Sequence, residues 1–125
     1  MPTPCRTLIV DDDPDVLALI ALEIELANDG LTVAGTATCG ADAVDALDET
    51  KPDVIVLDYM MPDSNGLEVA EKILYNHPEQ NIVLFSAFIT NHTETEARRV
   101  GVRECVLKDR MKELPSILRK YCPTP

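Results

Sequence analysis

Three consecutive aspartates, Asp11 to Asp13, follow an apolar run and precede a proline, and Asp58 ends a second apolar run. Adjacent carboxylates repel one another unless a cation joins them, and their hard oxygen atoms suit Mg²⁺. Taken alone, the triplet also fits the start of a helix, where negative charge favours the helix dipole. A metal site and a charged helix start therefore both remain open on this evidence.

Two more polar residues end apolar runs, Ser86 after "IVLF" and Lys108 after "CVL". A lysine can pair with a phosphoryl oxygen, a hydroxyl can donate to one, and a carboxylate can be the nucleophile that forms an acyl phosphate. Magnesium keeps several waters and is completed by substrate phosphate oxygens, so this set suits phosphoryl transfer. No Gly-rich phosphate loop is present, so a nucleotide is not the obvious donor. Each residue alone is an ordinary loop residue, and the argument depends on whether the fold gathers them.

The chain alternates short apolar runs, rich in Val and Ile, with longer helix-like segments. The runs are apolar at most successive positions, as expected of strands buried on both faces. They lie at residues 7–10, 31–37, 53–57, 81–85 and 104–107. The alternation predicts an α/β fold with a five-stranded parallel sheet and helices on both faces. Ligands bind beyond the carboxyl ends of such strands, so the four polar residues that end these runs are expected at one edge.

The helix-like segments carry start and stop signals. Asp13 followed by Pro14 predicts an N-cap and a first-turn proline, with "NDG" ending that helix. Further helices are predicted over residues 40–49, 65–76, 93–100 and 110–121. The fourth helix is expected to open with a Thr93–Glu96 capping box. Pro115 is expected to kink the last helix or delay its start.

Composition limits the class of protein. The 125 residues suit one domain with a single core, over residues 1–125 with the core at about 6–121. A formal net charge of −11 argues against nucleic-acid binding by this chain. No apolar run approaches the ~20 residues of a membrane span, and the first residues lack a signal-peptide pattern, which favours the cytoplasm. No CxxC spacing occurs, so the cysteines are expected to be reduced thiols with packing or surface roles. They are Cys5, Cys39, Cys105 and Cys122.

Four motifs, "LIVDDDP", "PDVIVLDYMMPDSNG", "VLFSA" and "GVRECVLKD", occur in this order. With them the chain, from about Arg6 to Tyr121, resembles the receiver domain of bacterial two-component response regulators. The resemblance implies a doubly wound, flavodoxin-like sheet of strand order 2-1-3-4-5. It also implies a phosphorylation-dependent signalling switch.

The resemblance assigns a role to each acidic residue. Asp58 matches the phosphoacceptor, which takes its phosphoryl group from a histidine kinase or a phosphotransfer protein. Asp11 and Asp12 match the acidic pair that holds Mg²⁺, together with Asp58 and the backbone carbonyl of Met60. Asp13 is then the cap of the first helix and not a ligand.

The remaining motif residues include two departures from the family, and one of them is Asp109, which stands where a proline usually follows the lysine. Ser86 matches the switch hydroxyl and Lys108 the active-site lysine, but Cys105 stands where receivers commonly carry an aromatic ring that moves on activation. Met60 and Phe88 match the two positions that flank the phosphorylation site. Partial burial against the neighbouring loop is the alternative for these two side chains.

The resemblance also sets expectations about partners and activity. It allows for an output domain or partner on the last helix-strand face and for a phosphorylation-dependent dimer, and it implies no chemistry beyond the domain's own phosphorylation and dephosphorylation. One alternative is a pseudo-receiver that binds partners without phosphorylation. Another is a metal-dependent phosphatase on a similar fold. The phosphatase would need a general acid at position 60, and Met60 cannot donate a proton.

Overall fold

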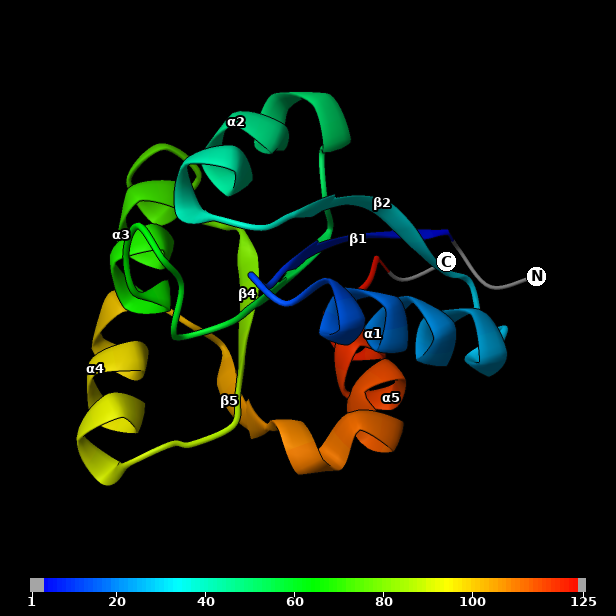
Figure 1. Ribbon diagram of the computed structural model, residues 1–125. Coiled ribbons are helices and arrows are strands. Elements are labelled where there is room, and N and C mark those ends of the chain that lie inside the picture. Colours follow the sequence, from blue (N-terminus) through cyan, green and yellow to red (C-terminus); the bar gives the residue numbers. More distant parts are fainter. Residues whose placement is uncertain (1–3, 124–125) are drawn as a thin grey trace.

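The computed structural model describes residues 4–123, in which five strands alternate with helices. All strand pairs are parallel, and the order is β2-β1-β3-β4-β5 (Figure 1). The strands are β1 (Cys5–Val10), β2 (Leu31–Ala37), β3 (Val54–Leu57), β4 (Asn81–Ser86) and β5 (Glu104–Leu107). The helices are α1 (Pro14–Ala27), α2 (Gly40–Thr50), α3 (Gly66–Asn76), α4 (Asn91–Val100) and α5 (Leu114–Arg119), with a 3₁₀ helix η1 (Lys108–Glu113) before the last. The doubly wound fold expected from the sequence is confirmed.

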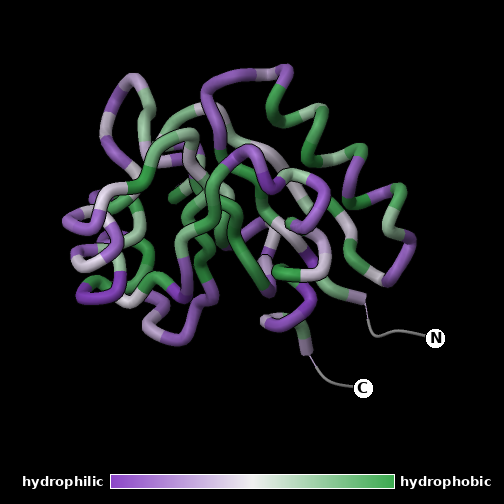
Figure 2. Tube along the Cα trace, turned by 90° about the horizontal axis from the view of Figure 1, so that it is seen from below, coloured by the Kyte–Doolittle hydropathy of each residue, from purple (hydrophilic) through white to green (hydrophobic). Residues whose placement is uncertain are grey.

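Two apolar clusters lie on the two faces of the sheet. Helices α1 and α5 cover one face, and α2, α3 and α4 cover the other (Figure 1). Successive strand residues alternate between the clusters, so Ile9 packs under α1 while Leu8 and Val10 face the opposite side. Apolar residues accordingly concentrate along the central strands (Figure 2). Among the helices that the structure describes, none combines the length and hydropathy of a membrane span.

The caps of the helices follow the sequence signals with one exception. Asp13 caps α1 as predicted, because its side chain accepts a hydrogen bond from the Asp15 amide at 2.9 Å. The capping box predicted at Thr93 is wrong, since α4 begins at Asn91 with Thr90 as its N-cap. The Thr90 hydroxyl accepts from the Thr93 amide at 3.0 Å, so Thr93 lies in the first turn.

Pro115 delays the last helix, as predicted. The chain first forms the 3₁₀ helix η1, and Pro115 then occupies the first turn of α5, where its missing N–H is harmless. The α-helix ends at Arg119, two residues before the predicted end.

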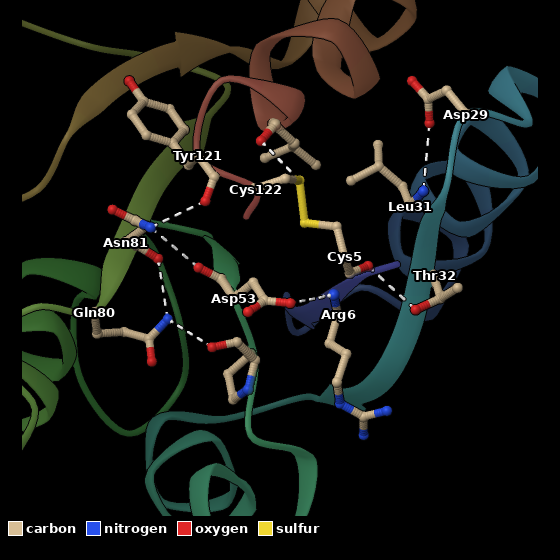
Figure 3. Close-up of a disulfide and its surroundings, with 12 residues drawn as sticks. Cys5, Arg6, Asp29, Leu31, Thr32, Asp53, Gln80, Asn81, Tyr121 and Cys122 are labelled. Carbon is tan, nitrogen blue, oxygen red and sulfur yellow. Dashed lines mark hydrogen bonds between the residues drawn. A yellow bond between two sulfur atoms is a disulfide. The ribbon is translucent and has the colours of Figure 1, made fainter. Parts of the chain in front are cut away.

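The expectation of reduced thiols is wrong for two of the four cysteines. Cys5 and Cys122 form a disulfide with a Cα–Cα distance of 5.5 Å, across a sequence separation of 117 (Figure 3). The physical reason is topological, because the start of β1 and the chain after α5 meet at the amino end of the sheet. Cys39 and Cys105 are free.

Candidate functional site

Two aspartates stand at the carboxyl ends of the two central strands. The Asp11 amide donates to the carbonyl of Ala37 at 3.0 Å, and the Asp58 amide donates to the carbonyl of Val10 at 2.9 Å. The sheet thus fixes the backbone of both residues. Asp11 is 1% exposed and Asp58 is 5% exposed. Buried carboxylates require partners, because burial penalises the charged form.

Asp12 and Lys108 complete a compact charged group with these two residues. Asp11, Asp12 and Asp58 each offer a carboxylate oxygen, and all three oxygens lie within 4.8 Å of one another. The Lys108 Nζ lies 2.7 Å from Asp11 Oδ2 and 3.3 Å from Asp58 Oδ1. The lysine enters from the end of β5, so three strands contribute to the group.

The electrostatics leave this group short of positive charge. Burial raises the pKa of Asp58, the nearby charge of Asp11 adds to this effect, and Lys108 opposes it. Burial disfavours charged Lys108, but the hydrogen bond to Asp11 and the charge of Asp58 outweigh it, so its pKa is raised. Three carboxylates face one ammonium group. The convergent hard oxygen atoms and the excess of negative charge fit a divalent cation such as Mg²⁺.

Asp13, the third member of the triplet, orients Asp11. Its amide donates to Asp11 Oδ1 at 2.9 Å while its own side chain caps α1. Its carboxylate is therefore engaged by the helix, and it does not belong to the acidic group.

Ser86 lies beside the acidic group at the end of β4 and is 3% exposed. Its hydroxyl donates to the carbonyl of Phe88 at 3.2 Å. Ser86, Met60 and Phe88 line the same surface depression as Asp58 and Lys108. Met60 is 68% exposed and Phe88 75% exposed, so partial burial, the alternative for these side chains, does not apply.

The loop after β3 returns tightly on Asp58. Met60 pairs with Asn65 in an isolated antiparallel bridge, and the Gly66 amide donates to the Tyr59 carbonyl at 2.6 Å. A Cβ atom at Gly66 would collide with the carbonyl oxygen of Asp58. Only glycine fits this close approach.

Comparison with known proteins decides the family. The family model of the response regulator receiver domain matches residues 7–119. The chain belongs to this family. The receiver is 34% identical over 103 residues to the chemotaxis protein CheY of Thermotoga maritima, covering 82% of this chain and 84% of CheY. It is 34% identical over 108 residues to the nitrate/nitrite response regulator NarL of Escherichia coli strain K12, covering 85% of this chain and 49% of NarL.

Solved structures agree. The signal receiver domain of the putative response regulator NarL from Mycobacterium tuberculosis superimposes with a TM-score of 0.85 at 27% identity, covering 96% of this chain and 98% of that chain. The response regulator domain of Thermotoga maritima CheB gives a TM-score of 0.86 at 27% identity, with 94% and 96% covered. The receiver spans most of CheY but about half the length of several other curated relatives.

Sequence reasoning missed one residue that supports the receiver's site. Asp63 accepts hydrogen bonds from the amides of Gly40 at 3.0 Å and Ala41 at 3.1 Å, at the start of α2. These bonds lower the pKa of Asp63 and tie the loop after Asp58 to the second helix. The "PDSNG" motif contains Asp63, but its partners lie 23 and 22 residues away and no local signal names them.

Cys105 lies three residues before Lys108, in β5, and is partly buried against the second apolar cluster. Burial raises the pKa of its thiol to about 11. A neutral thiol at this position packs and takes no part in the charged group.

Proposed function

We propose that Asp58 accepts a phosphoryl group from a histidine kinase or a phosphotransfer protein, and that the domain formed by residues 1–125, with its core at about 6–121, acts as a phosphorylation-dependent switch. The observation that carries the proposal is the group of three carboxylates within 4.8 Å, two of them buried, with Lys108 joining Asp11 to Asp58. Repulsion of this kind is relieved by a bound cation, which also attracts an incoming phosphoryl group.

In this proposal Asp11, Asp12, Asp58 and the Met60 carbonyl hold Mg²⁺. When bound, the ion neutralises negative charge on the phosphoryl oxygens that approach Asp58. The backbone at Met60 is supported on both sides, by the bridge to Asn65 and by the Gly66–Tyr59 hydrogen bond. The support keeps its carbonyl in a fixed place relative to Asp58.

The transfer itself needs a carboxylate nucleophile and a charge partner. A carboxylate oxygen of Asp58 attacks phosphorus, and the bond from phosphorus to the donor histidine nitrogen breaks with its electron pair left on nitrogen. Lys108, already 3.3 Å from Asp58 Oδ1, then pairs with a phosphoryl oxygen. Water attack on the acyl phosphate later restores the carboxylate, so the only chemistry is the domain's own phosphorylation and dephosphorylation.

Ser86 converts the new group into a change of shape. Its hydroxyl now donates to the Phe88 carbonyl, and after transfer it donates to a phosphoryl oxygen instead. The exchange frees the Phe88 backbone, and the 86–92 loop carries the change toward α4 and the last helix. Cys105 has no ring to rotate, so the loop is the relay.

We also propose that the protein acts in the cytoplasm, where it meets its kinase. Its face formed by α4, β5 and α5 is the proposed contact for an output domain, a partner or a second copy after phosphorylation. A solved structure of similar fold, 26% identical, is a DNA-binding response regulator of the LuxR family from Staphylococcus aureus. The net charge of −11 favours a separate domain for any DNA contact.

The test is the intact mass of the protein after incubation with acetyl phosphate and Mg²⁺. One phosphoryl adduct that disappears with time is the expected result. The absence of any adduct contradicts the proposal and favours a pseudo-receiver. Multiple-turnover hydrolysis of a phosphomonoester also contradicts it and favours a phosphatase.

A further inference from the structure

The amino end of the sheet holds a covalent contact that the switch does not use. Cys5 opens β1, is completely buried, and packs in the apolar cluster between α1 and α5. Cys122 is partly exposed and follows α5. The disulfide between them joins the first strand to the chain after the last helix (Figure 3).

The C-terminal tail, residues 120–122, has other contacts, and all of them are noncovalent. Asn81 Nδ2 donates to the Tyr121 carbonyl at 3.1 Å, as Figure 3 shows. The Tyr121 hydroxyl donates to Glu104, and Lys120 Nζ lies 2.6 Å from Glu104 Oε2. Water competes for these partly exposed hydrogen bonds and for the ion pair, so each of them contributes little to the stability of the tail. The disulfide adds a covalent link between the tail and β1 to these bonds and to the packing of Tyr121 against the apolar cluster under α1 and α5.

We propose that Cys5 and Cys122 form a reversible redox latch. Oxidation by a low-molecular-weight disulfide fastens the tail and the end of α5 to β1, and reduction by a dithiol releases them. The setting supports reversibility, since a cytoplasmic disulfide is rarely permanent. This argument for reversibility rests on the cytoplasmic location given in the proposed function.

The exposure of the two residues sets the order of the steps, because Cys5 is fully buried and Cys122 is partly exposed. In oxidation, the Cys122 thiolate attacks the small disulfide, expelling one thiol, and the Cys5 sulfur then displaces the second thiol from Cys122. The protein loses two electrons and two protons, and the small disulfide becomes two thiols. In reduction, a dithiol attacks the sulfur of the partly exposed Cys122, and Cys5 leaves as a thiolate that takes a proton. The second thiol of the dithiol then displaces Cys122.

The reduced state also has a place for both thiols. The Cys122 sulfur lies 3.4 Å from the Leu118 carbonyl, within reach for a thiol donor. Cys5 sits among apolar side chains, where a neutral thiol behaves as a small hydrophobic group. The fold can therefore survive opening of the latch.

The latch and the acidic group lie at opposite ends of β1. Cys5 and Asp11 are separated by the whole strand, roughly 20 Å at the rise of an extended chain. The latch therefore acts on the tail and α5, and acceptance of a phosphoryl group by Asp58 is independent of it.

The whole chain is tested after treatment with oxidised glutathione and after dithiothreitol. We expect two titratable thiols, Cys39 and Cys105, in the oxidised protein and four in the reduced one. Reduction should lower the Tm by roughly 10–20 °C, because the closed loop is long. It should also speed hydrogen exchange at the Tyr121 and Cys122 amides, which now donate to Leu118 and Arg119.

Cys122→Ser, which has three thiols, should match the reduced protein in Tm and in exchange at the tail amides under both treatments, while Cys39→Ser should keep the full redox response. Four titratable thiols after treatment with oxidised glutathione would overturn the proposal of a latch. A disulfide that dithiothreitol cannot reduce in the native protein would also overturn it. Equal rates of hydrogen exchange at the tail amides in the two redox states would have the same consequence. The mass adduct at Asp58 is followed in parallel. Its failure in both redox states contradicts the proposed function and leaves the thiol and exchange results intact.

Discussion

The two ends of the sheet differ in how their polar and charged groups are paired. At the amino end, several polar groups near the latch are paired, as when the Arg6 amide donates to Asp53 Oδ2 at 2.8 Å. Thr7 Oγ1 and Arg119 Nη1, however, are buried without a hydrogen-bond partner within residues 4–123. At the carboxyl end, three carboxylates share one lysine. The amino end gathers no such cluster of carboxylates among the described residues. In the proposed function, a cation and a phosphoryl group supply what the carboxyl end lacks, and this need is what makes that end responsive.

Strand β3 shows the contrast in a single element. Asp53 precedes the strand and Asp58 follows it. The same residue type makes a structural hydrogen bond to β1 at one end and is buried beside like charges at the other, where we propose that it does chemistry.

Exchanging each aspartate of this pair for asparagine should separate chemistry from structure. Asp58→Asn should abolish the Mg²⁺-dependent adduct, because an amide cannot attack phosphorus. Asp53→Asn should keep the adduct and lower the free energy of unfolding by about 1 kcal/mol or less, because the amide oxygen can still accept from the Arg6 amide and only the charge is lost. Intact mass and urea unfolding measure the two effects. An adduct that persists in Asp58→Asn contradicts the assignment of the acceptor.

Asp12 and Asp13, neighbours in the triplet, should differ in their effects on Mg²⁺ affinity and on stability. Asp12→Ala should weaken Mg²⁺ binding by at least about tenfold, equal to about 1.4 kcal/mol, because it removes a ligand. Asp13→Ala should bind Mg²⁺ far better than Asp12→Ala but lose roughly 0.5–2 kcal/mol of stability with its helix cap. Isothermal titration and thermal unfolding give both quantities. Equal losses of Mg²⁺ affinity would disprove the division of roles.

The exposed side chains above the acceptor should control the lifetime of the phosphorylated state. Water must reach phosphorus in line, and Met60 and Phe88 border that approach without offering a hydrogen bond. Met60→Asn combined with Phe88→Glu should speed dephosphorylation by about tenfold, which corresponds to about 1.4 kcal/mol in the barrier. The decay of the phosphorylated protein in Mg²⁺ without kinase measures this. An unchanged or slower decay means that these side chains do not gate the water.

The smallest effect concerns pH in the absence of Mg²⁺. Burial and Asp11 raise the pKa of Asp58 in the folded state above its ordinary value of 3.8. Protonated Asp58 therefore adds stability at low pH, and this contribution is lost as pH rises through the raised pKa. The Tm of the wild type should fall relative to that of Asp58→Asn over this window. Parallel Tm curves for the two proteins would contradict the argument.

The sequence predicted the carboxyl end far better than the amino end. Asp11, Asp58, Ser86 and Lys108 each end an apolar run, and parallel strands bring such ends together. Nothing local marks Cys5 and Cys122 as partners, because their pairing depends on how the last helix returns across the sheet. Asp63 was missed for the same reason, since its partners belong to another helix. Thr90 was missed because Thr93 offers a competing hydroxyl with its own downstream Glu96.

The disulfide also determines how the molecule bears force. A pull applied to the chain ahead of Cys5 and beyond Cys122 loads the sulfur–sulfur bond directly, because the two residues are 5.5 Å apart between Cα atoms. The strands and helices between them carry no tension. Only after reduction does the same pull reach β1 and α5, and the fold then becomes extensible.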